Sequence, residues 1–219
     1  MKKKLAIVLM IAVLTVLAAG CGQAGGSHLS SVDVQLQEET RALDGGRTVE
    51  LSYPVVSGSE ADEAATAVIE QLNEHFRQSA EAFVQQAAAI TDAEAGTVFT
   101  YATDVRYNEN GKLSVVEIEN LGNQQYYQYA ATYSLADGEK MTLGDLLDMK
   151  QSKAEETVVQ QFGGVIQSDS TTFHADAADY VKEHLDLLQY YRTSEGLTIF
   201  FQAGEIAPAS VGVIEIVIQ

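Results

Sequence analysis

Residues 98–135 read VFTYATDVRYNENGKLSVVEIENLGNQQYYQYAATYSL, and this stretch decides the fold of the chain. Three runs within it have the two-residue apolar alternation of a β-strand. The runs are residues 98–107, 112–120 and 125–135. Asn110-Gly111 tolerates the positive φ angles of a tight hairpin turn, and Leu121-Gly122-Asn123 marks a second reversal. The stretch therefore predicts three strands in an antiparallel meander.

A hairpin and a long helix are predicted before the meander. Apolar and polar residues alternate on both sides of a turn at Asp44-Gly45-Gly46. The alternating apolar residues are Val32, Val34, Leu36, Val49, Leu51 and Tyr53. A helix follows from the N-cap candidate Ser59 to about Ile90, with apolar residues at three- and four-residue steps. Its stripe holds many alanines and few large side chains, so we expect one helix lying across a sheet rather than a coiled coil.

The residues after the meander predict short helices followed by two strands. Helices are expected to start at Thr142, an N-cap candidate, and over residues 152–166 and 175–185. Residues 197–201 alternate as a strand, and residues 213–218 form a last strand that is apolar on both faces. A strand of this kind is expected in the centre of its sheet.

Strands and helices are segregated along the chain, which predicts an α+β fold. We expect an antiparallel meander sheet with one long helix, followed by a smaller helix-and-strand C-terminal subdomain. The boundaries predicted from the sequence are an N-terminal α+β companion domain at residues 32–135 and a C-terminal domain at residues 136–219.

The first residues predict a lipoprotein signal. Met1-Lys2-Lys3-Lys4 is followed by an apolar run from Leu5 and by Leu17-Ala18-Ala19-Gly20-Cys21, which resembles the lipobox of bacterial lipoproteins. We expect residues 1–20 to be a signal peptide, Cys21 to be the lipidated N-terminus, and residues 21–31 to form a Gly/Ser-rich tether. An ordinary cleaved signal or an uncleaved anchor is the alternative. Lipidation at Cys21 would anchor the protein in the cell membrane, on its extracytoplasmic face.

The composition restricts the partners. The chain has 31 acidic and 13 basic residues, a net charge of −18, and removal of residues 1–20 leaves 10 basic residues and a net charge of −21. Such a surface repels nucleic acid and suits a cationic protein such as lysozyme. A cell-wall polymer bound through the sheet and its loops is the other partner considered. Cys21 is the only cysteine, so no disulfide within the chain is expected.

No catalytic or metal motif stands out. The chain has no Gly-x-Ser-x-Gly elbow and no cysteine to pair with a histidine, so we expect no enzymatic activity and no cofactor. Asp176, Asp179, Glu183 and His184 fall within one predicted helix. Their three- and four-residue steps fit a solvated acidic face better than a metal site.

Four residues are candidates for ligand contact. Glu205 lies in a tight loop between Gly204 and Pro208, where it can either meet a ligand or accept backbone N–H groups and shape the loop, and we favour the second. Tyr127, Tyr129 and Tyr133 share one strand face. They can stack on sugar rings, although cross-strand packing is the favoured interpretation.

The segments Tyr133–Leu147 and Gly196–Pro208 resemble a bacterial domain of unknown function. That domain occurs in the extracytoplasmic part of the anti-sigma factor RsiV and beside the catalytic domain of the peptidoglycan deacetylase PdaC, and the N-terminal half here resembles its usual companion domain. The resemblance implies a lipid-anchored, extracytoplasmic binding protein of the cell envelope whose ligand is a protein or a cell-wall polymer. It also implies two alternatives: a lysozyme-binding sensor or decoy, and an enzyme or accessory module in peptidoglycan modification.

Overall fold

The structure is a computed structural model that describes residues 27–58, 62–122, 126–169 and 171–218. The predicted signal peptide, Cys21 and the tether up to residue 26 lie outside the described residues. Among the helices that are described, none has the length and apolar character needed to cross a membrane.

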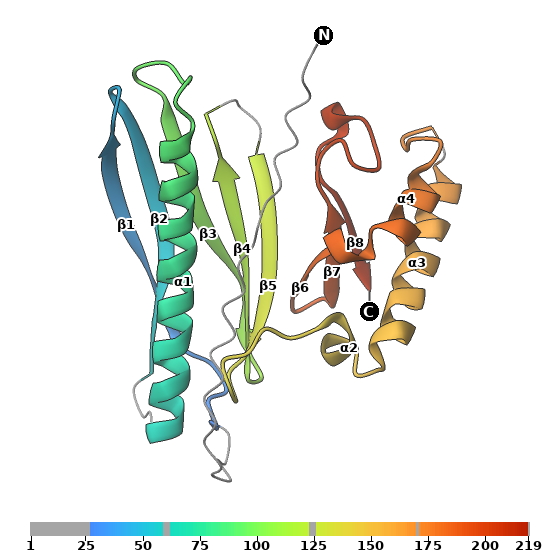
Figure 1. Ribbon diagram of the computed structural model, residues 1–219. Helices are drawn as coiled ribbons and strands as arrows, with labels where there is room; N and C mark the ends of the chain where they lie inside the picture. Colours follow the sequence, from blue (N-terminus) through green and yellow to red (C-terminus); the bar gives the residue numbers. More distant parts are fainter. Residues whose placement is uncertain (1–26, 59–61, 123–125, 170, 219) are drawn as a thin grey trace.

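The N-terminal half is a five-stranded sheet with one long helix on one face (Figure 1). The strand order is β1-β2-β3-β4-β5, and all neighbours are antiparallel except β2 and β3, which run parallel with α1 connecting them. The elements are β1 (Asp33–Leu43), β2 (Arg47–Ser57), α1 (Glu63–Ala89), β3 (Val98–Glu109), β4 (Lys112–Asn120) and β5 (Tyr126–Ser134). The predicted α+β class and the β3-β4-β5 meander are confirmed.

Local chemistry fixes the ends of these elements. Asn110 and Gly111 adopt φ angles of 53° and 71°, which confirms the predicted tight turn between β3 and β4. Helix α1 begins after Asp62, whose Oδ1 accepts a hydrogen bond from the Ala65 N–H at 2.8 Å. The predicted cap Ser59 lies outside the described residues.

The apolar stripe of α1 packs on the sheet, as the sequence predicts. The buried residues of the helix recur at three-, four- and seven-residue steps. They are Ala65, Val68, Leu72, Phe76, Ala80, Phe83 and Ala87. They form one core with side chains from β2, β3, β4 and β5.

The C-terminal half is a three-stranded antiparallel sheet, β6-β7-β8, covered by helices. Its elements are α2 (Leu143–Leu146), α3 (Gln151–Ser168), α4 (Ala177–Glu183), β6 (Gln189–Arg192), β7 (Leu197–Phe201) and β8 (Ile214–Ile218). The Thr142 side chain caps α2, as predicted, and Asp145 completes a capping box by accepting the Thr142 N–H at 2.8 Å.

The prediction that the last strand is central in its sheet is wrong. The buried central strand is β7, and β8 lies at the edge. Ile214 and Ile216 pack into the C-terminal core on one face of β8, whereas Val217 on the other face is 44% exposed. A half-exposed valine is common on an edge strand. The apolar residues on both faces of β8 are therefore compatible with an edge position.

The two sheets pack against each other where β4 and β5 meet β6 and β7. Side chains on the face of the first sheet that points away from α1 contact the second sheet. The buried cluster consists of Val116, Ala130, Tyr191 and Phe200. Beside it, the Arg192 N–H donates to the hydroxyls of Ser114 and Thr132 at 3.1 and 3.2 Å. Helix α1, the two sheets and the helices α3 and α4 thus form successive layers (Figure 1).

The outer edge of β5 is hydrogen-bonded to the C-terminal half. Gln189 Oε1 accepts the Ala130 N–H at 3.0 Å, and Gln202 Oε1 accepts the Gln128 N–H at 3.0 Å. Gln202 Nε2 also donates to the Gln128 carbonyl. Farther along the strand, Met141 N–H donates to the Thr132 carbonyl at 2.8 Å. Two side-chain amides and the segment after β5 therefore take the place of a neighbouring strand.

Residues 27–31, which the sequence assigns to the tether, lie against the N-terminal half. Ser27 N–H donates to the Ala136 carbonyl at 2.8 Å, and Gly111 N–H donates to the Ser30 carbonyl at 2.9 Å. Leu29 packs on the N-terminal core. This part of the chain is therefore held by the domain.

Candidate binding groove between α1 and β5

A groove lies on the helix-covered face of the first sheet. Helix α1 packs mainly over β2 and β3, so part of the face formed by β4 and β5 is left open. The groove has a volume of about 670 Å³. Its walls come from α1, β4 and β5, with single residues from the segment after β5 and from β6. They are His75, Ser79, Ala82, Phe83, Gln86, Glu117, Glu119, Tyr129, Ala130, Ala131, Tyr133, Lys140 and Gln189.

Two carboxylates stand side by side in this groove. Glu117 and Glu119 are two residues apart on β4 and so point to the same face. Their direct cross-strand partners are Tyr129 and Tyr127. Neither carboxylate forms an ion pair with another described residue. Sequence reasoning missed both residues.

Burial changes the acidity of both groups. Burial and, to a lesser extent, the nearby charge of Glu117 raise the pKa of Glu119 to about 7. Burial also raises the pKa of Glu117, against the opposing effects of the Tyr101 and Ser79 hydroxyls and of the Lys140 charge. At neutral pH Glu119 is therefore only partly ionised.

A buried hydroxyl without a partner lies beside two residues of the groove lining, Glu117 and Ser79. Tyr101 on β3 is 1% exposed, and burial raises the pKa of its hydroxyl. Glu117 and Ser79 are near enough to influence that pKa, yet no described atom is in hydrogen-bond geometry with the hydroxyl. A buried hydroxyl normally has a partner, so this one is an exception that needs a cause.

Tyr133 serves the core more than the groove. It is almost fully buried, its ring meets that of Phe76 edge to face at 5.7 Å, and its hydroxyl contacts His75 Nε2. Burial and the neighbouring Lys140 lower the pKa of His75, so this ring is neutral at pH 7. Tyr133 is thus held by packing, as the sequence favoured.

Tyr129 is the aromatic ring that the groove offers to a ligand. It is half-buried, and burial together with Glu119 raises the pKa of its hydroxyl to about 12. Tyr127 lies next to Tyr129 on the same face of β5, but it does not line the groove. The predicted tyrosine row is therefore divided between a buried packing residue and a ring at the groove.

Glu205 lies in the loop after β7 and holds that loop's shape. Its Oε2 accepts the Gln202 N–H at 2.7 Å, while the Glu205 N–H donates to the Gln202 carbonyl at 3.1 Å. Burial raises the pKa of Glu205, and the Gln202 N–H and His184 lower it. Because Gln202 in turn binds Gln128, Glu205 acts on β5 through that glutamine. Its role as a ligand contact stays a prediction.

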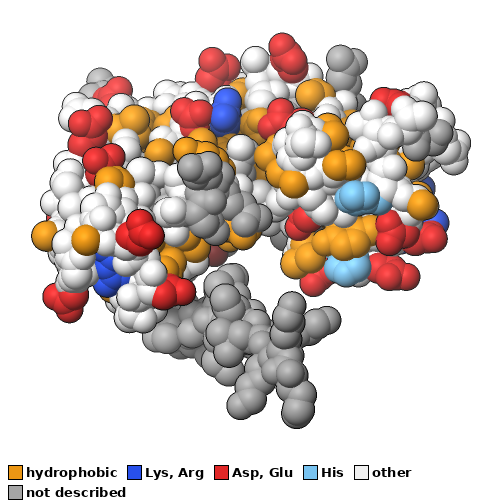
Figure 2. All heavy atoms as spheres, turned by 90° about the horizontal axis from the view of Figure 1, so that it is seen from above, with side chains coloured by type: hydrophobic (Ala, Val, Ile, Leu, Met, Phe, Trp, Pro, Cys, Tyr) orange, Lys and Arg blue, Asp and Glu red, His pale blue; other side chains and the backbone are white. Residues whose placement is uncertain are grey.

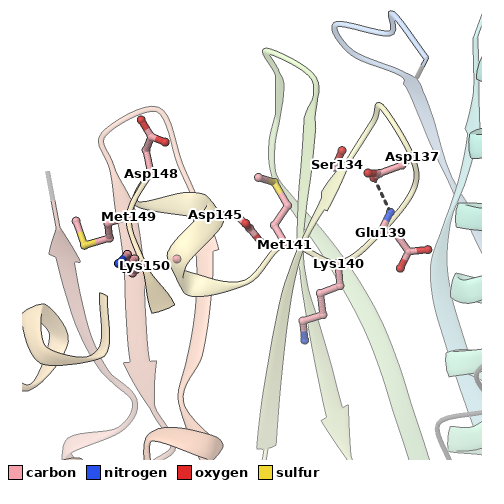
Figure 3. A pocket seen from close by; sticks show the side chains of 10 residues that line it. Ser134, Asp137, Glu139, Lys140, Met141, Asp145, Asp148, Met149 and Lys150 are labelled. Atoms are coloured by element: carbon pink, nitrogen blue, oxygen red, sulfur yellow. Dashed lines mark hydrogen bonds between the residues drawn. The ribbon is translucent and has the colours of Figure 1, made fainter. Parts of the chain in front are cut away.

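A second hollow, of about 650 Å³, lies where the chain passes from β5 to α3 (Figure 3). Its carboxylates already serve local turns: Asp137 accepts the Glu139 N–H at 3.1 Å, and Asp145 caps α2. Lys140 borders both hollows, and its side chain points away from that of Met141 (Figure 3). The groove is the stronger candidate because its carboxylates have no such local partners.

The rest of the described surface is acidic. Seen from above, Asp and Glu side chains spread over both halves and few Lys or Arg side chains lie between them (Figure 2). On α4, Asp179 pairs with Lys182 at 3.1 Å, and His184 stacks on Tyr180 with ring centres 4.0 Å apart. Within the described ranges, no group of three or more His, Cys, Asp or Glu side chains is placed to hold a metal ion.

Replacement of Glu119 by glutamine should stabilise the protein above neutral pH. The pKa of Glu119 is raised from 4.5 to about 7 on folding, so between these values the folded state holds a proton that the unfolded state has lost. Stability from this group is therefore present at low pH and is lost as the pH rises through 7. With a discount for partial exposure, Glu119→Gln should raise the free energy of unfolding at pH 8 by roughly 1–3 kcal/mol and leave it unchanged near pH 4.

Urea unfolding at both pH values measures this difference. Glu50→Gln is the matched control, because Glu50 is exposed on the opposite face of the sheet. An equal change for the two variants, or a gain at pH 4 as large as at pH 8, would contradict the proposed burial of Glu119.

Comparisons with known proteins identify part of the chain. Residues 145–219 match the family described as Protein of unknown function (DUF3298). A search of curated proteins gave no match.

Two solved structures share the fold of both halves. One is a DUF3298 family member from Bacteroides fragilis NCTC 9343, with 13% identity, a TM-score of 0.55, and coverage of 88% of this chain and 91% of that chain. The other is a DUF3298 family protein from Pseudomonas aeruginosa PAO1, with 12% identity, a TM-score of 0.55, and coverage of 87% and 90%. Identities this low establish the fold and nothing about activity. Residues 145–219 of this chain are therefore similar in sequence to the DUF3298 family.

Proposed function

We propose that this chain is a lipid-anchored, extracytoplasmic binding protein of the cell envelope that takes its ligand in the groove between α1 and β5. The ligand is a cell-wall polymer or a protein. The single observation that supports this proposal is the groove itself, in which an aromatic ring and two partly buried carboxylates line one open concavity. Apolar walls with a few convergent polar groups are typical of ligand sites.

The groove suits binding more than chemistry. Tyr129 offers a ring face for stacking, and Glu117 and Glu119 offer acceptors for hydroxyl or amino groups. A lysozyme-binding sensor or decoy is the second candidate, because the acidic surface favours a cationic protein. A role in peptidoglycan modification, as an enzyme or an accessory module, is the third.

Retention of soluble peptidoglycan fragments and of lysozyme by the detergent-purified full chain tests the ligand. Tyr129→Ala should weaken binding of the true ligand roughly tenfold or more, because the ring lies at the groove. Tyr126→Ala is the matched control, since Tyr126 is exposed on the same strand and points to the other face.

The competing results are distinct. Equal binding by the Tyr129 and Tyr126 variants would exclude the groove as the site, and retention of neither ligand would contradict the binding proposal. Turnover of the wall fragments by the wild-type protein would replace binding with catalysis.

The proposed anchor depends on Cys21, which supplies the only thiol of the chain. Cys21→Ser should release the protein from the membrane fraction, because stable attachment requires the acyl chains. Mass spectrometry of the wild-type protein should find lipid on Cys21. A variant that still sediments with membranes, together with an unmodified wild type, would contradict the anchor.

A further inference from the structure

We propose that the groove between α1 and β5 binds a primary ammonium group carried on an apolar stem, with Glu117 and Glu119 as its acceptors and Tyr129 against its stem. This inference deepens the proposed function, because it uses the same groove and names the chemical group that the groove recognises.

Acidic side chains outnumber basic ones in the groove, which favours a cationic ligand. Glu117 and Glu119 face it from β4, and Lys140 is the one charged basic side chain among the described residues that line it. His75 faces it from α1 and is neutral at pH 7, because burial lowers its pKa. Glu119 has no cationic neighbour that lowers its pKa. A partly buried carboxylate without a counter-ion destabilises a protein, and a bound cation would remove this penalty.

A second, independent observation points to the same position. The Tyr101 hydroxyl is buried beside Glu117 and Ser79, two residues that line the groove, and it has no hydrogen-bond partner among the described residues. A hydroxyl oxygen accepts as well as donates, so it can accept a hydrogen bond from an ammonium group held by Glu117. The three N–H donors of a primary ammonium match two carboxylates and one hydroxyl.

The apolar walls of the groove suit a ligand with an apolar stem better than a small inorganic cation. Phe83, Ala82 and Ala131 line the groove with apolar surface, and Tyr129 adds an aromatic ring. Aromatic rings attract cations through their electron-rich faces, and methylene groups pack on them. Tyr133 from β5 and the amides of Gln86 and Gln189 complete the polar lining. A lysine side chain carries the required group on an apolar stem, whereas an amino sugar carries the same ammonium group on a hydroxylated ring.

Calorimetric titration of the full chain with small probes tests the proposal. The probes are Nα-acetyl-lysine methylamide and its Nε-acetylated, uncharged form, with glucosamine and N-acetylglucosamine as the second pair. One charged probe should bind and its acetylated counterpart should not. Glu119→Gln and Glu117→Gln should each weaken binding about tenfold or more, whereas Glu50→Gln on the opposite face should have no effect.

Acidification from about pH 8 to about pH 5.5 should weaken binding of the charged probe by a further tenfold or more. This prediction applies to the lysine derivative, which keeps its charge over the whole range. Glu119 gains a proton in this range because burial and the charge of Glu117 raise its pKa to about 7. The titratable groups that line the groove with Glu119 are Glu117, Tyr129, His75, Tyr133 and Lys140, and its direct cross-strand partners are Tyr127 and Tyr101. Of these, His75 is already neutral at the start of the range.

The outcomes separate this inference from the proposed function. Preference for the lysine derivative indicates a protein ligand, and preference for glucosamine indicates a wall polymer. Both results support the ammonium site. Equal binding of charged and acetylated probes, absence of binding, or insensitivity to Glu119→Gln would overturn it, even if wall fragments still bind in a Tyr129-dependent manner. Loss of fragment and lysozyme retention with the ammonium site intact would instead overturn the proposed function.

Discussion

A chain that ends at Gly212 should not form its C-terminal half. It lacks β8, which supplies Ile218 to the C-terminal core and packs Ile214 and Ile216 beside it. Burial of these three side chains contributes roughly 4 kcal/mol, because only Ile218 is fully buried and the other two are partly so. The loss also leaves the backbone groups of β7 unpaired on that side. A domain is typically stable by about 5–15 kcal/mol, so this loss together with the unpaired backbone would remove a large part of the stability.

Urea unfolding followed by circular dichroism measures this loss. Val217→Thr in the full chain is the matched control, since Val217 faces away from the C-terminal core and is largely exposed. We expect it to change the free energy of unfolding by less than about 0.5 kcal/mol. A shortened chain with an unchanged cooperative transition would show that β8 is dispensable.

Phe200→Ala should both destabilise the protein and separate its two halves. Phe200 is fully buried between the sheets, where its ring contacts Tyr191 with ring centres 6.0 Å apart and packs with Val116 and Ala130. Removal of a buried phenylalanine ring destabilises by roughly 3–5 kcal/mol. Because this ring fills the contact between the sheets, calorimetry should show one heat-absorption peak for the wild type and two for the variant.

The neighbouring residue provides the control. Phe201 is equally buried but points to the opposite face, where its ring meets Phe162 edge to face at 5.1 Å. Phe201→Ala should lower stability by a similar amount without splitting the transition. Two peaks for both variants, or for neither, would contradict the assignment of Phe200 to the contact between halves.

Local chemistry made several elements predictable from the sequence. The Asn110-Gly111 turn, the Thr142 cap and the stripe of α1 depend on neighbours in the chain, and each is present in the structure. These features are set by backbone conformation and side-chain period, which a sequence displays directly.

Features that depend on distant partners were not predictable in the same way. Strand β6, Gln189–Arg192, has no apolar alternation of its own and exists because β7 pairs with it. The parallel pairing of β2 with β3 follows from the path of α1, which a meander pattern does not reveal. The edge position of β8 likewise depends on what lies beside it.

The groove could have been predicted in part. Glu117 and Glu119 interrupt an apolar strand at the two positions opposite Tyr129 and Tyr127. Carboxylates at alternate positions of a strand whose neighbour carries tyrosines indicate a shared polar face. Whether α1 would cover that face or leave it open depends on its crossing of β2 and β3, and no local pattern specifies that crossing.

The glutamine side chains on the outer edge of β5 have a consequence for the order of folding. β5 itself, YYQYAATYS, contains no charge, no proline and no glycine, which are the residues that discourage chains from joining edge to edge. Gln189 and Gln202 lie 55 and 68 residues beyond the end of the strand, so the first sheet can form before they reach its edge. Until Gln189 and Gln202 bind to β5, a completed first sheet would expose an unpaired strand edge with which other chains can pair. The C-terminal half thus protects the edge of β5 from association with other chains. We therefore expect the isolated N-terminal half to self-associate.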